Sequence, residues 1–551
     1  MKRSGLARPN MLSALRGAGA TGKRRRGRGA GRRRDDIFVS GVASSARAGR
    51  RDHPEVASMS RFTSSLAALA LLCASGAVAQ EAGTPEPPAP DDWGQALRDD
   101  ARAFHDLIAE SHPGPVDTEN PEFVSLLEGG LKTALERART ADSYQHWYYA
   151  LSEYQASFND GHLNLHDFAK MGHVLPRRWP GFITGLQIDP NGAEQHAVLL
   201  SREPDGPPEG AVLIECDGRS ADVLAADVVG RAAGRWNLRS RRVNFAGALF
   251  LDWGNPYAAR PQTCVFDVEG RPTTYRLSWR DVSLETQQEG LAAGRTTRFT
   301  APIEMREWTG GAWISLGGFD GNPTGVDGVR LVPLQAEVEA NAAKLRATPR
   351  VVFDLRGNNG GSSAWINAMA RTLWGDSWVD ARAPRSEGVD WRTSIANQET
   401  IEGYKARFAQ QPEMLDWANA ITDGLQQARA EGRELWRQAS EDQTAPDANP
   451  TTDMTARVFV LTDFGCASAC LDAVDLLKAL GAVHVGQETS ADTLYMEVRG
   501  RRLPSGRATA VVPMKVYRGR TRGSNEPAVP AHLWTGALSD TAGLERWIAA
   551  L

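Results

Sequence analysis

The chain lacks the features that mark several large classes of protein. It has no apolar run long enough to cross a bilayer as a permanent helix, which argues against a membrane-spanning protein. It shows no internal repeat. Its glycine-rich turn, RGNNGG at 356–361, lacks the Lys-Ser/Thr ending that a nucleotide P-loop needs. With 551 residues, the chain is too long for one core and suits about three domains.

The first 79 residues differ from the rest. Residues 1–58 carry 15 Lys/Arg against 4 Asp/Glu, a balance that could bind nucleic acid. From Met59, however, MSRFTSSLAALALLCASGAVAQ has a short apolar run and a small-x-small ending, which predict a signal peptide over 59–79 with cleavage after Ala79. A signal peptide stands at the true N-terminus. We therefore expect residues 1–58 not to be translated in the cell, and the protein to be exported, periplasmic or secreted.

Without residues 1–79, the chain is acidic and lacks the basic segment that could bind nucleic acid. The remainder has 47 Lys/Arg and 63 Asp/Glu, a net charge of about −16. An acidic, soluble chain is a poor partner for nucleic acid.

Cysteine is scarce, with five in the whole chain. In an exported protein, Cys216 and Cys264 could pair, because both fall in one predicted domain. Cys466 and Cys470 bracket Ser468 at a spacing that does not suit a metal site, and no histidine lies near them. We expect these two to be small, buried packing residues, with a disulfide as the less favoured alternative.

The patterning beyond residue 80 predicts an α/β protein with several parts. Residues 80–91 are a Pro-rich acidic linker, and 92–170 show three helical patterns that end in SFNDGHLNL. Residues 171–290 hold short β-type runs between Gly, Pro and Asp, which predict a β-rich module. From 291 to 551, strand and helix patterns alternate, as in an α/β core. Residues 376–455 are polar and mostly helical, and we interpret them as an insertion or lid in that core.

The segment RVFVLTDFGCASACLDAVDLLKALGAVHVG predicts strand, tight turn, helix and strand, with Ser468 where the helix begins. Free backbone N–H groups collect at such a helix start, so a serine there can have an oxyanion site beside it. A serine at a helix start is more often a simple N-cap. The RGNNGG turn favours the catalytic interpretation, because consecutive glycines let backbone N–H groups approach a ligand closely.

Three phrases together resemble the peptidase family of the C-terminal-processing (tail-specific) proteases and the tricorn core. They are DLRGNNGG, CASAC at the strand-to-helix turn, and GQET one helix later. The resemblance covers roughly residues 92–551. It implies a mixed α/β (ClpP/crotonase-like) catalytic core, a helical N-terminal region and a PDZ-like module, here 171–290. It also implies peptide or unfolded-protein substrates and no metal or cofactor.

The family uses two catalytic schemes, and this chain fits one of them. The processing proteases pair the serine with a lysine in a GEPTxGK-like phrase, where this chain has GQETSAD and places Asp492. The tricorn-like branch uses Ser, His and Glu instead. The DGHT-like turn corresponds to SFNDGHLNL and implies His162 as general base. The glutamate nearly sixty residues after the serine corresponds to Glu526 in RGSNEPAVPAH.

The expected site therefore has Ser468 as nucleophile, His162 as base and Glu526 as the orienting carboxylate. Oxyanion donors would be the N–H of Ala469 and that of Gly360 or Gly361. Competing side chains are His112, His166, His484, Asp160 and Asp472.

Three rival functions stay open: a non-catalytic relative that binds apolar ligands or peptides, an esterase, and an interaction scaffold built on the PDZ-like module. The sequence does not indicate an oligomeric state.

Overall fold

The computed structural model describes residues 90–166, 175–189, 192–294, 299–407, 409, 412–440 and 449–551. The expected basic segment (1–58), the signal peptide (59–79) and nearly all of the linker (80–91) lie outside the described residues. All the described residues belong to one compact unit.

The α/β core is built on a six-stranded sheet in the order β10-β11-β12-β15-β16-β19. Its first pair is antiparallel, and from β11 onward the neighbours are parallel. The strands are β10 (Ile303–Trp308), β11 (Gly311–Leu316), β12 (Arg350–Asp354), β15 (Arg457–Thr462), β16 (Val483–Gly486) and β19 (His532–Leu533). The middle residues of the central strands β12 and β15 are apolar and buried because both faces of this sheet are covered.

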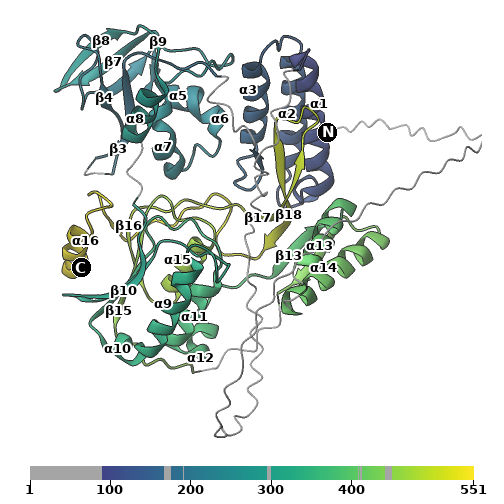
Figure 1. Ribbon diagram of the computed structural model, residues 1–551, viewed down its shortest axis with the longest axis vertical. Coiled ribbons are helices and arrows are strands. Elements are labelled where there is room, and N and C mark those ends of the chain that lie inside the picture. The colour runs from purple at the N-terminus through teal and green to yellow at the C-terminus, as the bar shows by residue number, and fades with distance from the viewer. Residues whose placement is uncertain are drawn as a thin grey trace, which may run out of the picture. The chain divides into compact units, whose positions relative to one another are not determined.

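Helices cover the two faces unequally (Figure 1). Phe353 and Val460 point to the face packed against α9, α11 and α15, while Val352 and Phe459 point to the other face and contact α16. The helices are α9 (Gly328–Ala340), α10 (Ala342–Ala347), α11 (Ala364–Trp374), α15 (Ala469–Ala479) and α16 (Thr541–Ala550). Alternate residues of one strand thus belong to two separate hydrophobic cores.

The N-terminal helices share their core with a distant part of the chain. Apolar residues of α1, α2 and α3 pack against Tyr495, Ala510 and Val512 of the β17–β18 hairpin. These elements are α1 (Trp93–Ser111), η1 (Gly114–Val116), α2 (Phe123–Arg137), α3 (Tyr144–Ser157), β17 (Tyr495–Arg502) and β18 (Thr509–Arg518). The predicted helical region, 92–170, is therefore completed by residues almost four hundred positions later, which Figure 1 shows as yellow strands beside the purple helices.

The β-rich module has a sheet in the order β3-β4-β5-β7-β8, with β6 paired to β5. Its elements are β2 (Arg178–Trp179), β3 (Phe182–Ile188), β4 (Glu194–Ser201), β5 (Val212–Cys216), β6 (Arg219–Ser220), α5 (Ala221–Ala225), η2 (Ala226–Gly230), α6 (Arg231–Ala233), α7 (Arg239–Phe245), η3 (Ala246–Ala248), β7 (Thr263–Val268), β8 (Arg271–Arg276), β9 (Arg280–Asp281) and α8 (Leu284–Gly294). Short helices lie between β6 and β7 and after β9, and a PDZ-like identity stays a prediction.

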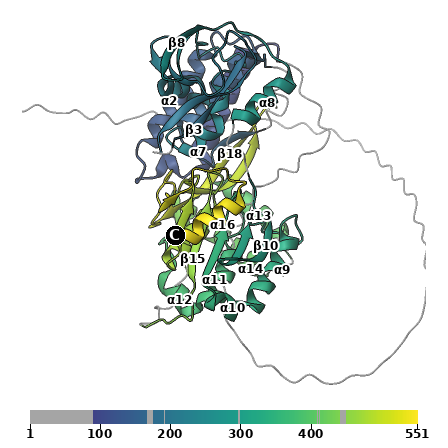
Figure 2. The same ribbon diagram turned by 90° about the vertical axis from the view of Figure 1, so that its left-hand side faces the viewer.

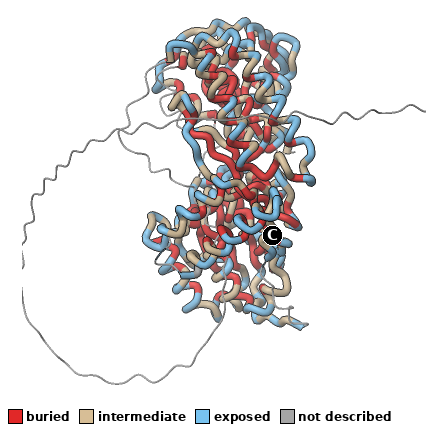
Figure 3. Tube along the Cα trace, turned by 90° about the vertical axis from the view of Figure 1, so that its right-hand side faces the viewer, coloured by how far each residue is buried: buried red, intermediate tan, exposed pale blue. Residues whose placement is uncertain are grey.

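The insertion, 376–455, is mostly helical but also contributes two strands. Its elements are α12 (Asp376–Arg382), β13 (Gly388–Arg392), α13 (Ile395–Arg407), α14 (Pro412–Ala430) and β14 (Leu435–Ala439). β13 and β14 extend the sheet β1-β18-β13-β14, in which β1 (Asn164–His166) is the other edge. Trp391, Ile421 and Leu425 form a buried cluster with Met514 of β18. Figure 2 gives a second view of these helices, and Figure 3 shows buried residues running through the sheets.

Candidate active site

Ser468 occupies the turn between β15 and α15 in an unusual backbone conformation. Its φ is 56° and its ψ is −127°, a region that non-glycine residues rarely occupy. This strand-turn-helix geometry resembles the strained elbow that exposes the nucleophile in other serine hydrolases. The neighbouring N–H groups of Ala469 and Gly361 donate to no protein acceptor within the described residues. The turn therefore places a half-buried serine beside two backbone N–H groups that can donate hydrogen bonds.

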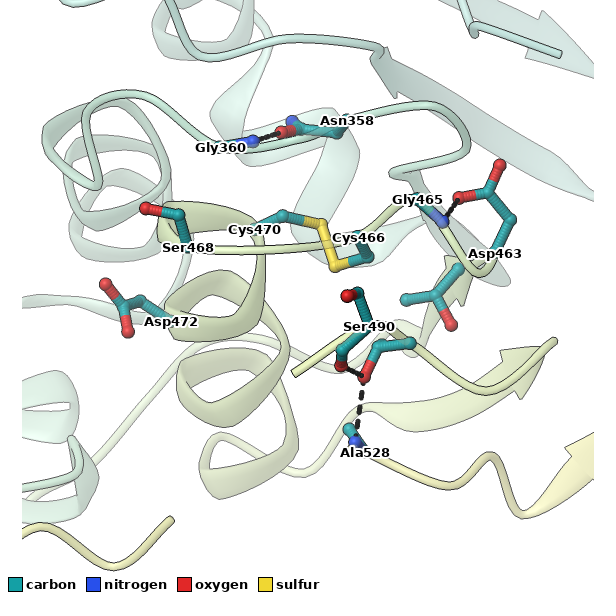
Figure 4. Close-up of a disulfide and its surroundings, with 12 residues drawn as sticks. Asn358, Gly360, Asp463, Gly465, Cys466, Ser468, Cys470, Asp472, Ser490 and Ala528 are labelled. Atoms are coloured by element: carbon teal, nitrogen blue, oxygen red, sulfur yellow. Dashed lines mark hydrogen bonds between the residues drawn. A yellow bond between two sulfur atoms is a disulfide. The ribbon is translucent and has the colours of Figure 1, made fainter. Parts of the chain in front are cut away.

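The glycine-rich turn lies directly against this serine. β12 and β15 are adjacent parallel strands, so the loops after their carboxyl ends meet at one edge of the sheet. A methyl group on Gly360, which has φ 106°, would stand 2.6 Å from Ser468 Cβ and 3.1 Å from the Ala469 nitrogen. The Gly360 N–H donates to Asn358 Oδ1 at 2.9 Å. Of the two glycines expected as oxyanion donors, Gly361 thus has the uncommitted N–H, whereas the N–H of Gly360 is bonded to Asn358 (Figure 4).

Asp463 ties the two turns together. Its carboxylate accepts the N–H of Gly357 at 2.9 Å and that of Gly465 at 2.9 Å. Burial raises the pKa of Asp463 to about 6, against these two hydrogen bonds, which lower it. The proton is therefore bound more tightly in the folded than in the unfolded chain.

That pKa predicts a pH dependence of stability. Because the folded pKa lies above the unfolded one, the stabilisation from Asp463 is complete below about pH 4 and is lost as the pH rises through about 6. Between pH 4.5 and 7 the loss should be about 2 kcal/mol. In urea unfolding, the free energy of unfolding of the parent should fall between pH 4.5 and 7 by about 2 kcal/mol more than that of Asp463→Asn. Equal slopes in the two proteins would contradict the assignment.

Asp492 contacts the turn that carries Ser468. Its Oδ1 accepts the Ser468 N–H at 3.2 Å, and its Oδ2 lies 3.8 Å from Arg522 Nη1. A Ser–Lys dyad would need an amine here. Lys515 is buried elsewhere, 3.5 Å from Glu497 and over the ring of Trp391.

Hydrogen bonds link the segments that carry the other expected residues. Asn525 donates its N–H to the Asp492 carbonyl at 2.6 Å and its Nδ2–H to the Asn159 carbonyl at 2.8 Å. Arg235, from the β-rich module, donates to Asn525 Oδ1 at 2.7 Å and to the Ala491 carbonyl. Loops 159–162, 491–493 and 523–526 therefore form one cluster next to Ser468.

Within this cluster, the side chains of His162 and Glu526 are not hydrogen-bonded to each other. His162 Nδ1 is buried and has no hydrogen-bond partner in the part of the chain that the structure describes. The exposed Glu526 carboxylate accepts the Gly523 N–H at 2.8 Å. The structure thus brings the segments together but does not form the His–Glu contact.

The competing histidines have structural partners. His112 Nε2 donates to Asp160 Oδ2 at 3.1 Å, and its Nδ1 accepts the Gly114 N–H at 2.8 Å, so neither nitrogen is available as a base. Burial lowers the pKa of His484 to about 4, and its Nε2 lies 2.7 Å from Thr462 Oγ1. His166 is an exposed residue of β1.

The competing carboxylates are also engaged. Asp160 Oδ1 accepts the His162 N–H at 2.8 Å and the Thr493 hydroxyl at 2.9 Å. Burial raises the pKa of Asp160, but the His112 hydrogen bond and the charges of both histidines outweigh it, and the pKa is lowered overall. Asp472 accepts the Ser363 hydroxyl at 2.8 Å and pairs with Arg520.

Both cysteine pairs form disulfides. Cys216 and Cys264 are paired residues of β5 and β7, as the sequence allowed. Cys466 and Cys470 are also joined, so the expectation of two separate packing residues is wrong. A separation of four residues spans one turn between the end of a strand and the start of a helix, which brings the two side chains together.

A cavity of about 410 Å³ lies apart from this chemistry, between α3 and the β-rich module. Its lining is largely apolar and includes Tyr149, Leu249 and Trp253. None of the six expected site residues lines it.

Part of the chain matches a known protein family. Residues 332–530, which include both turns, match the family model of peptidase family S41. The match covers 199 of the 551 residues, so this part of the chain is similar to peptidase family S41, and the similarity supports a serine-type peptidase. No curated protein matches the chain.

The fold is shared with a solved structure. The crystal structure of mature CPAF matches 80% of this chain and 93% of its own, with a TM-score of 0.52 and 15% identity. The photosystem II D1 C-terminal processing protease matches 81% of this chain and 93% of its own, with a TM-score of 0.28 and 12% identity. Within the described residues, no helix is both long and apolar enough to span a membrane.

Proposed function

We propose that the protein is an exported serine peptidase of the tricorn-like branch, which hydrolyses peptides or unfolded chains through an acyl-enzyme on Ser468. The observation that carries the proposal is the backbone of Ser468, with φ 56° and ψ −127° at a helix start and the Gly360 turn in contact. Such a backbone conformation costs about 1–3 kcal/mol and persists only where the surroundings enforce it.

In this mechanism, His162 takes the Ser468 hydroxyl proton as the oxygen attacks the substrate carbonyl, and then protonates the leaving amine. The N–H groups of Ala469 and Gly361 stabilise the oxyanion. Asp492 cannot serve as an amine base, and its hydrogen bond to the Ser468 N–H gives it a positioning role. The Ser–His–Glu scheme therefore fits these residues better than the Ser–Lys scheme.

The third residue, Glu526, requires one rearrangement. Its carboxylate would exchange the Gly523 N–H for the proton on His162 Nδ1, which has no partner among the described residues. Asn525 already bonds to Asn159, three residues before His162, so the two loops are adjacent. Catalytic hydrogen bonds often tighten only when substrate binds.

Labelling with a fluorophosphonate tests the proposal. Intact-mass analysis of the full chain should show one adduct, mapped to Ser468 by peptide sequencing and absent from Ser468→Ala. Ser490→Ala, which alters a nearby serine, should label at the parent rate. No adduct on the parent would contradict the proposal and favour a binding protein.

Turnover separates the peptidase from the esterase. We expect the labelled serine to support hydrolysis of unfolded casein as well as of nitrophenyl esters, with both activities lost together in Ser468→Ala. Ester turnover without any cleavage of unfolded protein would favour the esterase alternative.

A further inference from the structure

The disulfide Cys466–Cys470 encloses the candidate nucleophile. Ser468 is the middle of the three residues between the two cysteines, and Cys470 is the second residue of α15. Both cysteines are fully buried. In Figure 4 the sulfur–sulfur bond lies alongside the segment that leads into Ser468. A covalent bond therefore closes a small ring around the residue with the strained backbone.

Hydrogen bonds also hold this turn, among them one from the Leu471 N–H to the Ser468 carbonyl at 2.8 Å. The Cys466 N–H donates to the Asp463 carbonyl at 3.2 Å, and the Cys470 N–H donates to the Ala467 carbonyl at 3.1 Å. From outside the turn, Asp492 accepts the Ser468 N–H at 3.2 Å, and Ser490 donates its N–H to the Cys466 carbonyl at 3.0 Å. These bonds act at single backbone atoms, whereas the disulfide joins the two ends of the strained segment covalently.

We propose that the Cys466–Cys470 disulfide is a positioning element that holds Ser468 in its reactive conformation, so that the peptidase is fully active only with this bond formed. The inference rests on the proposed function. Without the bond, Ser468 can relax to a negative φ. That change would move its hydroxyl and would rotate the Ala469 N–H away from the oxyanion position. A chain still in a reducing compartment would lack this constraint.

The second disulfide supplies a matched control. Cys216–Cys264 joins residues 48 apart, whereas Cys466–Cys470 joins residues 4 apart. A cross-link that closes a longer loop restricts the unfolded chain more, so Cys216–Cys264 should contribute more to global stability. A purely structural role predicts that activity follows stability in both cases. A positioning role predicts that loss of Cys466–Cys470 lowers activity more, and that loss of Cys216–Cys264 lowers stability more.

The experiment compares three full-length proteins: the parent, Cys466→Ala/Cys470→Ala and Cys216→Ala/Cys264→Ala. We measure the second-order rate of fluorophosphonate labelling, kcat and KM for a peptide, and the Tm. For Cys466→Ala/Cys470→Ala we expect labelling and kcat to fall at least about tenfold, with KM nearly unchanged and the smaller loss of Tm. Cys216→Ala/Cys264→Ala should show the larger loss of Tm and near-parental labelling below its Tm.

Each other outcome has a defined meaning. Labelling of Cys466→Ala/Cys470→Ala within twofold of the parent would overturn the positioning role and leave the peptidase proposal intact. The positioning role would also be overturned if, in both variants, the labelling rate fell in proportion to the loss of Tm. A parent chain that never labels would refute the proposed function itself, and the inference with it.

A second measurement covers the case in which the alanines disturb folding. In the Cys216→Ala/Cys264→Ala background, the chain is unfolded in urea and refolded with or without dithiothreitol. The reagent's two thiols pass two electrons and two protons to the remaining disulfide and become a cyclic disulfide. We expect the chain refolded with dithiothreitol to regain the parental circular dichroism but to label at least about tenfold more slowly. Equal labelling of the two refolded forms would overturn the proposal.

Discussion

Replacing His162 by alanine should lower kcat for peptide hydrolysis by about 10⁴-fold or more. The loss is large because Ser468 would have no group to take its proton and none to protonate the leaving amine. KM should change little, because the imidazole acts on the transition state rather than on substrate binding. Steady-state kinetics on a fluorogenic peptide measures both constants.

His166 provides the control for that variant. It lies four residues later and is exposed on β1, opposite Thr509 of β18. His166→Ala should keep kcat within about twofold, as surface substitutions usually do. If His162→Ala retained more than a tenth of parental kcat while folding normally, the base would have to be another group. His112 would not be that group, since both its nitrogens are engaged.

The order of elements in the core could be predicted from the sequence because local signals were strong there. RVVFDL and RVFVLT contain short runs of β-branched and aromatic residues, which favour buried strands, and they form β12 and β15. Gly375, with φ 88°, ends α11 where the periodic pattern stops. The positions of Ser468 and the glycine turn follow from these strands.

Long-range relations were harder to predict. Nothing in the α1–α3 pattern shows that Tyr495 and Val512 complete their core, because the hydrophobic faces of helices do not specify which strand covers them. The disulfide Cys466–Cys470 was undervalued for a related reason. The sequence predicts a tight turn at Ser468 but not its backbone conformation, φ 56° and ψ −127°, and it therefore does not show that the two sulfur atoms come within bonding distance.

The candidate site also has features that the sequence predicts and features that it does not. The backbone features at Ser468 and Gly360 follow from glycine content and strand order. The contact between His162 and Glu526 depends on a side-chain rotamer in a loop, and Glu526 instead accepts the Gly523 N–H. Arg235 was missed entirely. Its role arises from three loops that are distant in sequence, and its positive φ of 52° was the kind of signal that only coordinates provide.

Gly360→Ala should inactivate the enzyme even though Gly360 takes no part in the chemistry. The new methyl group would stand 2.6 Å from Ser468 Cβ and 2.8 Å from the Ala467 carbonyl oxygen, and the residue would have to hold φ 106°. Because both neighbours are part of the serine turn, the turn must shift. A displaced oxyanion donor alone costs about 10²–10³ in kcat, and we expect a loss at least that large.

Gly375→Ala tests the cost of a side chain at positive φ without a steric clash. Gly375 also has a positive φ, 88°, but a methyl group there would meet no atom within 4 Å. This variant should lose about 1 kcal/mol of unfolding free energy and keep parental kcat. The measurement is kcat and urea unfolding for both variants, together with fluorophosphonate labelling of Ser468. Equal activity of Gly360→Ala and Gly375→Ala would show that the glycine turn does not shape the nucleophile, and the oxyanion role of its neighbour Gly361 would lose its support.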